Sequence, residues 1–258
     1  MVGRLLLRGM LAGVVAGLLA FGFARVFGEP PIEHAIAFEA HEAHHHADAH
    51  SDHHMQGETD EPELVSRTTQ AGLGLFVAVV VYGAAIGGLY ALVFAFVYGR
   101  FGQLSPRATA ALLAAAAFVS LVLVPALKYP ANPPAVGAPE TIGSRTALYF
   151  AMIVISVAAL IFAVGLAKNL ASRCDGWSAG LVGAASYVAI VAIAGYALPV
   201  VDEVPDHFSA SVLWNFRIAS LGLQAVLWTI VGLLFGFLAE RVLAQPSRGR
   251  LYQAGVQR

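Results

Sequence analysis

Six long apolar stretches, separated by polar segments, dominate the pattern of the chain. They cover approximately residues 5–27, 71–98, 108–127, 146–167, 179–198 and 213–243. A helix needs about 20 apolar residues to cross the ~30 Å hydrocarbon core of a membrane, so each stretch is long enough. None of them alternates apolar with polar residues as the strands of a membrane barrel do. Because backbone polar groups in lipid must be satisfied internally, the pattern predicts an all-α polytopic membrane protein with about six transmembrane helices.

The first stretch has two interpretations. Basic residues precede it and small residues follow it, which is also the layout of a signal peptide. Its length and its glycines at every fourth position favour a retained helix that lets a neighbouring helix approach closely. The same spacing recurs in two later stretches, and we interpret it as helix packing rather than as pore lining. The glycines concerned are Gly9, Gly13, Gly17, Gly83, Gly87, Gly232 and Gly236.

Composition agrees with a membrane protein. Of the 258 residues, 58% are hydrophobic and 12% are charged, and the mean hydropathy is +0.72. Soluble domains have about 45–50% apolar and about 25% charged residues, so an ordinary soluble enzyme, a nucleic-acid-binding protein and a disordered chain are excluded. The net charge of −1 indicates no polyanionic partner. The single cysteine, Cys174, excludes a disulfide framework or a thiolate metal cluster within one chain.

The distribution of lysine and arginine predicts the orientation. With the N-terminus in the cytoplasm, ten of the 15 basic residues fall on the inner side, and both termini lie inside. We therefore expect one membrane domain over residues 1–258. Its short cytoplasmic loops are 99–107 and 168–178. Its longer outer loops are 28–70, 125–145 and 199–217, and we expect the function on that side.

Histidines concentrate in the first outer loop, which also carries ten acidic residues. Imidazole nitrogen is the commonest protein ligand for transition metals, and nearby carboxylates can complete a coordination shell. A hydrophilic loop with a biased composition is the alternative, but so dense a histidine run favours metal binding. Affinity at a plain histidine site favours copper, nickel and zinc over cobalt. The predicted metal ligands are His34, His41, His44, His45, His46, His50, His53, His54, Glu42, Asp48 and Asp52.

The second and third outer loops resemble each other. Each begins at a proline that we expect to end a helix, Pro125 or Pro199, and each has an arginine at the mouth of the next apolar stretch, Arg145 or Arg217. This likeness suggests a repeat of the third and fourth spans onto the fifth and sixth. Prolines at helix ends free carbonyl groups, and transporters use such helix ends at binding sites.

Charged and amide side chains in these loops are the predicted mouth of a permeation pathway. Arg217 lies just inside the sixth stretch, where it is either buried for function, paired with an acid of the third loop, or reaching out to the interface. Lys128 and Arg145 are expected simply to reach the interface. The candidate pathway residues are Lys128, Asn132, Asp202, Glu203, Asp206, His207, Asn215 and Arg217.

Motifs of catalysis are missing from the sequence. There is no G-x-x-x-x-G-K-[ST] phosphate-binding loop, no H-E-x-x-H zinc motif and no plausible serine triad. No apolar stretch carries a central aspartate or glutamate for a proton relay. We therefore expect a protein that is not an enzyme and that holds no tightly bound cofactor.

Two segments carry a family resemblance. Residues 128–137 read KYPANPPAVG and residues 213–222 read LWNFRIASLG. Together with the six-helix pattern, the histidine-rich first outer loop and Glu203-Val204-Pro205, they resemble the CbtA family of predicted cobalt transporter components over nearly the whole chain. The resemblance implies cobalt uptake across the bacterial inner membrane, linked to vitamin B12 synthesis. It also implies a small, single-span partner subunit with its own histidine-rich segment.

The sequence thus supports two hypotheses. The first is a component of a divalent transition-metal uptake transporter, with cobalt, nickel or zinc as the ion, whose outer loop captures the metal. Binding there must be weak or multi-site so that the ion can leave. The second is a membrane protein that senses or buffers metal, or assists assembly, without transporting it.

Overall fold

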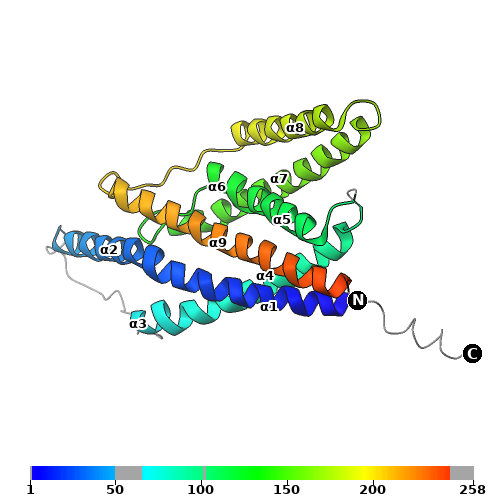
Figure 1. The fold of residues 1–258 in the computed structure, drawn as a ribbon. Coiled ribbons are helices and arrows are strands. Elements are labelled where there is room, and N and C mark those ends of the chain that lie inside the picture. The colour runs from blue at the N-terminus through cyan, green and yellow to red at the C-terminus, as the bar shows by residue number, and fades with distance from the viewer. Residues whose placement is uncertain (1, 50–65, 101–102, 245–258) are drawn as a thin grey trace, which may run out of the picture. The chain divides into compact units, whose positions relative to one another are not determined.

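The computed structural model of the chain describes residues 2–49, 66–100 and 103–244, and only the backbone over 42–49 (Figure 1). Its described residues contain helices and no strand, as the sequence predicts. Six helical stretches are long and apolar enough to cross a membrane, which confirms the predicted multi-pass architecture. They are Val2–His41, Arg67–Val97, Pro106–Lys128, Pro139–Leu170, Gly176–Ala197 and Ala210–Leu243. The inside–outside orientation stays a prediction.

Each span is built from one or more helical elements. The α-helices are α1 (Val2–Phe23), α2 (Glu29–Ala49), α3 (Arg67–Thr69), α4 (Leu75–Val97), α5 (Pro106–Ala117), α6 (Val124–Lys128), α7 (Ile142–Leu170), α8 (Gly176–Ala197) and α9 (Ala210–Leu243). The π-helical segments are η1 (Ala24–Gly28), η2 (Gln70–Gly74) and η3 (Phe118–Leu123), and η4 (Pro139–Thr141) is a 3₁₀ turn.

The predicted outer loop over residues 28–70 is wrong in its first half, which is helical to Ala49. Two prolines, Pro30 and Pro31, lie near the start of α2, which continues from α1 through the π-helical turn η1. In that turn the Glu29 N–H group bonds the Ala24 carbonyl, five residues back, and the wider turn gives the proline rings room. Alanine and glutamate, which favour helices, fill much of the rest of α2. Polarity alone indicated a loop, but it describes solvent exposure rather than backbone conformation.

The second difference concerns Pro125, which does not end its helix as expected. The chain continues as α6 to Lys128 and leaves the helix at Tyr129, the residue before Pro130. A proline inside a helix clashes with the carbonyl of the residue four positions earlier. The π-helical turn of η3 comes just before Pro125, and there Val124 N–H bonds Val119 O, five residues back. The wider turn gives the proline ring room.

Two compact units make up the chain, and each is described by itself. The first unit contains Met1–Phe21, Gly72–Ala116 and Val226–Arg258, and the second contains Gly22–Ala71 and Ala117–Ala225. All four points at which the chain passes from one unit to the other fall inside helical stretches.

Glycines bring α1 and α4 into backbone contact in the first unit. A Cβ atom on Gly13 would overlap the carbonyl oxygen of Gly83, and one on Gly9 would overlap that of Gly87. On α9, Gly232 faces the methyl group of Ala114 on α5. The predicted packing role of these glycines is confirmed.

The second unit is organised around α7 and α8, which lie side by side as a hairpin (Figure 1). Its core contains Val124, Tyr129 and Met152, with partly buried side chains of α7 and α8 around them. Ser156 on α7 and Tyr187 on α8 share a hydrogen bond of 2.8 Å. This core fixes the end of α6, and with it the start of the non-helical segment that follows.

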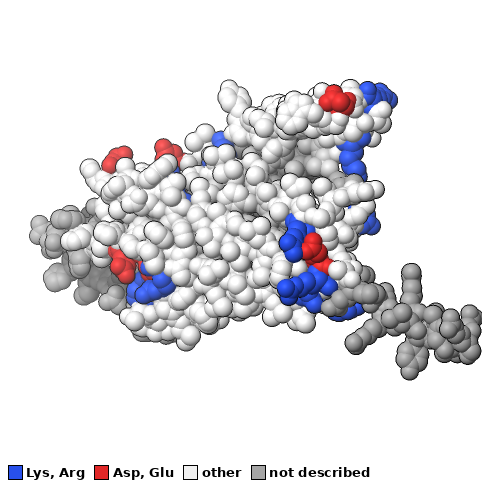
Figure 2. Space-filling view, viewed as in Figure 1, with Lys and Arg blue, Asp and Glu red and all other residues white. Residues whose placement is uncertain are grey.

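The surface shown in Figure 2 is largely uncharged, with lysine, arginine, aspartate and glutamate lying mainly near helix ends. Large apolar side chains are exposed along the helices, among them Leu7, Val81, Phe96, Val154 and Ile193. Exposed apolar side chains along helices long enough to cross a membrane are those expected to face lipid.

Replacing Gly13 by alanine is expected to destabilise the first unit. The added methyl group meets the α4 backbone, which cannot move aside as a flexible side chain would, and overpacking of this kind costs about 1–3 kcal/mol. Thermal unfolding of the purified protein in detergent measures the effect. Gly22→Ala is the matched control, because a Cβ there would have nothing within 4 Å. Equal melting temperatures for the two variants would contradict the close packing.

Candidate functional site

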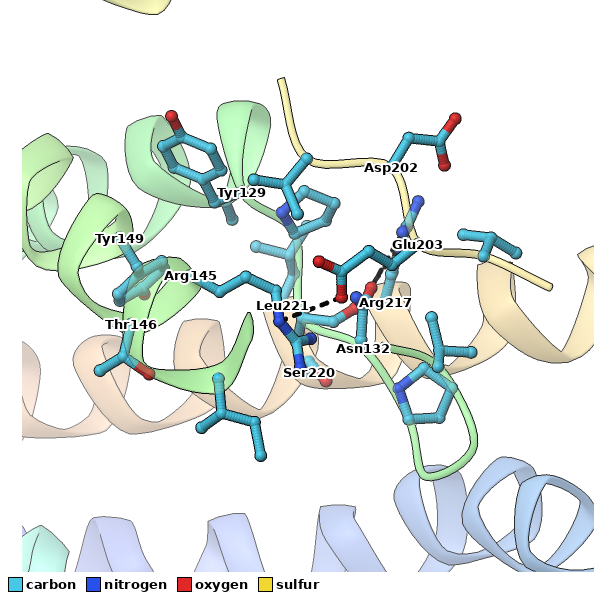
Figure 3. Close-up of a pocket in the computed structure, with 18 of the residues that line it drawn as sticks. Tyr129, Asn132, Arg145, Thr146, Tyr149, Asp202, Glu203, Arg217, Ser220 and Leu221 are labelled. Carbon is cyan, nitrogen blue, oxygen red and sulfur yellow. Dashed lines mark hydrogen bonds and ion pairs between the residues drawn. The ribbon is translucent and has the colours of Figure 1, made fainter. Parts of the chain in front are cut away.

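A cavity of about 800 Å³ lies within the second unit. Its walls come from the segment after α6, the first turns of α7, the segment between α8 and α9, and one face of α9 (Figure 3). The polar and aromatic residues that line it are Tyr129, Asn132, Arg145, Thr146, Tyr149, Asp202, Glu203, Arg217, Ser220 and Gln224. Prolines, aliphatic side chains and these polar groups together give the mixed lining typical of a small-molecule site.

The non-helical backbone around the cavity is tied down by side chains. Tyr129 donates a hydrogen bond of 2.8 Å to the carbonyl of Pro199, which joins the segment after α6 to the segment after α8. Gly137 has a φ of +112°, and a Cβ atom there would overlap the Arg145 guanidinium group. Both the backbone conformation and the close approach therefore require glycine at this position.

Glu203 makes the second connection between the two segments. One carboxylate oxygen, Oε2, accepts a hydrogen bond of 3.0 Å from the Ala138 N–H group and lies 2.8 Å from the Thr141 hydroxyl. The same oxygen lies 3.3 Å from Nε of Arg145, with which it forms an ion pair. Both side chains are mostly buried, with exposed fractions of 19% for Glu203 and 23% for Arg145. Two hydrogen-bond donors and one positive charge from residues 138–145 thus converge on a single carboxylate of the other segment.

This environment lowers the pKa of Glu203 below the ordinary glutamate value. The hydrogen bond from Thr141 is the largest cause, and the Ala138 N–H group and the charge of Arg145 act in the same direction. The partial burial of the carboxyl opposes them. Glu203 is therefore ionised at neutral pH, and its charge is balanced by Arg145.

Arg217 extends from α9 toward the segment after α6 (Figure 3). Its Nη2 donates a hydrogen bond of 3.0 Å to Oδ1 of Asn132, and its Nε donates one of 3.4 Å to the carbonyl of Ala131. The acids of the third loop, which the sequence suggested as partners, do not pair with it, because Glu203 pairs with Arg145. In the part of the chain that the structure describes, Arg217 has no carboxylate partner.

The structure brings four of the eight candidate pathway residues to the cavity: Asn132, Asp202, Glu203 and Arg217. The other four, Lys128, Asp206, His207 and Asn215, do not line it, and Asp206 and His207 are exposed.

Arg145, expected only to reach the interface, is instead a wall of the cavity. The likeness of the two loops already related Arg145 to Arg217, and it was the one signal in the sequence for this role.

Two of the predicted metal-binding histidines have described side chains, His34 and His41, and both are exposed on α2. Nδ1 of His34 lies 2.7 Å from the carbonyl of Pro30, so this nitrogen carries the proton and the other ring nitrogen is left as an acceptor. The side chains of Glu42, His44, His45, His46 and Asp48, and all of His50, Asp52, His53 and His54, lie outside the described residues. Within the described part, no three His, Cys, Asp or Glu side chains gather as a metal site.

The helix that carries the histidines is anchored beside the cavity. Ala35 and Phe38 of α2 pack in one cluster with Val136, Val204 and Phe208. The rings of Phe38 and Phe208 meet edge to face, with centroids 5.2 Å apart. Val136 and Val204 also line the cavity. The apolar side of α2 is therefore in direct contact with two cavity walls.

An ion pair fixes the base of the same helix. The carboxylate of Glu29, the first residue of α2, lies 2.6 Å from Nη2 of Arg67, at the start of α3. Glu29 is 6% exposed, whereas the Arg67 side chain is 37% exposed, so the carboxylate of the pair is shielded from solvent and the guanidinium group is not. It holds together the two ends of the segment that contains the histidines.

Comparison with known families decides the relationship. A family model described as a probable cobalt transporter subunit (CbtA) matches residues 2–240, nearly the whole chain. The chain belongs to the CbtA family. No curated protein and no solved structure matches it. CbtA membership makes this chain a component of a probable cobalt transporter, which agrees with its six membrane-spanning helices and implies both a metal substrate and a partner.

Replacing Glu203 by glutamine is expected to destabilise the second unit at neutral pH. Because the pKa of Glu203 is lowered in the folded state, its stabilising effect is full above the ordinary glutamate pKa of about 4.3. That effect is lost as the pH falls through the lowered value. The melting temperatures of Glu203→Gln and the unmodified protein should therefore differ at pH 7, and the difference should shrink as the pH falls below about 4.3. Glu140→Gln, at an exposed residue of η4, is the control, and a difference that persists unchanged in acid would contradict the ion-pair role.

Proposed function

We propose that this chain is the multi-pass component of a cobalt uptake transporter in the bacterial inner membrane. Its histidine-rich segment, residues 34–54, captures Co²⁺ at the outer face and raises its concentration beside the cavity of the second unit. A small single-span partner with its own histidine-rich segment completes the transporter. CbtA membership supports the cobalt substrate and the partner, and the clustering of eight of the nine histidines supports metal capture.

The observation that carries the proposal is the docking of α2. A flexible tether would hold captured ions at no fixed distance from the cavity. Here Phe38 and Ala35 pack against Val136 and Val204, which belong to the cavity wall, while His34 and His41 are exposed on the same helix. His34 and His41 lie four residues before and three residues after Phe38, on the same face of the helix as the docked ring. Metal captured by them would therefore stay next to the cavity.

The chemistry of the histidines suits transient capture. The hydrogen bond from His34 to Pro30 fixes the ring and leaves one nitrogen to bind metal, as in many metal sites in which the second ring nitrogen is held by a carbonyl. Binding by the histidines must be weak or multi-site, because an ion held tightly would not leave for the pathway. Acidification releases the ion, because metal and proton compete for the same nitrogen.

Replacing all eight histidines of residues 34–54 by glutamine should reduce cobalt accumulation at nanomolar but not at micromolar cobalt. The substitution removes the ligands and keeps the length of the segment, so the pathway itself remains open at high concentration. Cellular cobalt is measured in the presence and absence of the small partner, and nickel and zinc are measured in parallel.

Three results bear on this experiment. Equal loss at both concentrations would show that the histidines belong to the pathway rather than to a capture device. Accumulation of nickel or zinc but not cobalt would make the chain a permease for another metal. Metal binding without accumulation of any metal would favour the sensor or buffer and would end the transport proposal.

Replacing Phe38 by alanine should uncouple capture from transport. The edge-to-face contact with Phe208 is lost, and such pairs are worth about 0.5–1.5 kcal/mol, so docking should weaken roughly twofold to tenfold. Metal binding by the purified protein is expected to be unchanged, while uptake at nanomolar cobalt falls. Ile36→Ala, at an exposed position of α2, is the matched control. Unchanged uptake in Phe38→Ala would contradict a functional role for the docked helix.

A further inference from the structure

The charges around the cavity do not suit a bare divalent cation. The carboxylate of Glu203 is already neutralised by Arg145 and bonded by Ala138 and Thr141. Asp202 is exposed, and Figure 3 shows its carboxylate pointing away from this pair. Arg217 forms no ion pair with a carboxylate within the described residues, so its guanidinium group presents positive charge to the cavity. A Co²⁺ ion entering alone would be repelled by it.

The cavity instead offers hydrogen-bond donors. A guanidinium group carries five N–H donors, and Asn132 and Ala131 receive the two that form hydrogen bonds. Ser220 and Gln224 lie three and seven residues beyond Arg217 on α9, which places them on the same face of the helix. Oε1 of Gln224 is fully buried and has no hydrogen-bond partner. This oxygen is an acceptor, so it requires a donor group from a ligand or an ordered water.

The volume of the cavity also favours a ligand larger than a hydrated ion. Six first-shell waters around an ion occupy roughly 180 Å³ at about 30 Å³ per water. The cavity is about 800 Å³, which falls in the range of roughly 300–1,000 Å³ for sites that bind small organic molecules.

We propose that the cavity binds a small organic anion through a carboxylate held by Arg217, and that cobalt enters it as an anionic carboxylate chelate. The planar guanidinium group matches a carboxylate in a two-bond arrangement, and Oε1 of Gln224 can accept a hydrogen bond from a hydroxyl group of the same ligand. A chelate with net negative charge is attracted by the same arginine that repels the bare ion. The chelate form rests on the proposed cobalt uptake, whereas the anion site rests on the cavity alone.

Citrate is a suitable probe, because its three carboxylates leave a net charge of −1 when it binds one Co²⁺. Binding of radiolabelled citrate to the purified full-length protein is measured with and without one equivalent of cobalt. Arg217→Ala should weaken binding about tenfold to a hundredfold, which corresponds to loss of a charge-assisted hydrogen bond. Arg173→Ala, at an exposed arginine between α7 and α8, is the control and should bind as the unmodified protein does.

Gln224→Glu separates an anion site from a cation site even if Arg217→Ala fails to fold. The substitution keeps the shape of the side chain and adds a negative charge. At an anion site citrate binding weakens, whereas at a cation site binding of Co²⁺ alone becomes tighter. Gln224→Leu controls for the loss of the amide. Tighter cobalt binding with unchanged citrate binding would overturn the proposal.

Two further comparisons identify the molecule that binds in the cavity. Preference for cobalt citrate over free citrate supports the chelate, and equal affinity limits the inference to the organic anion. Citrate binding that disappears in nanodiscs containing anionic phospholipid but persists in zwitterionic ones would assign the cavity to a lipid headgroup and would overturn the proposal. Cobalt accumulation without citrate binding would leave the uptake function standing and remove only this inference. Citrate binding without cobalt accumulation would leave the anion site standing and remove the uptake function.

Discussion

One carboxylate oxygen, Oε2 of Glu203, holds together the two segments that form the cavity of the second unit. The segments that follow α6 and α8 are largely non-helical, so side-chain contacts rather than helical hydrogen bonds must hold them in place. Oε2 of Glu203 accepts hydrogen bonds from Ala138 and Thr141 and forms an ion pair with Arg145. Tyr129 adds a second bond to Pro199. The cavity walls, the requirement for glycine at position 137 and the platform on which α2 docks all depend on these two segments staying together.

The fold was predictable where hydropathy alone decides it. Six spans follow from uninterrupted apolar stretches, because each stretch fits only a membrane-crossing helix. Two features were not predictable in this way. The helix of α2 is polar, and its formation depends on tertiary contacts of Ala35 and Phe38 with residues more than 90 positions away. The π-helical turn before Pro125 relieves a proline clash that sequence rules treat as a helix end.

The cavity was predictable only in part, because hydropathy locates loops but not the pairs within them. Asn132, Glu203 and Arg217 were identified from their polarity at the mouths of apolar stretches. Their partners were not, since the sequence suggested Arg217 as the partner of an acid in the third loop, whereas Glu203 pairs with Arg145. The hydrogen-bond donors of Thr141 and Ala138 place the Glu203 carboxylate beside Arg145.

The geometry of α2 sets how far captured metal stands from the lipid. The uninterrupted apolar stretch ends at Phe27, and the helix axis rises about 25 Å from Glu29 to His46 at about 1.5 Å per residue. The headgroup layer adds about 5–8 Å to each side of the hydrocarbon core, and ionic screening reduces its electrostatic reach to about 8 Å at physiological salt. An α2 helix that leaves the bilayer therefore carries His46 beyond the cations that lipid phosphates attract. Histidines at that distance bind metal from solution rather than metal already bound at the membrane surface.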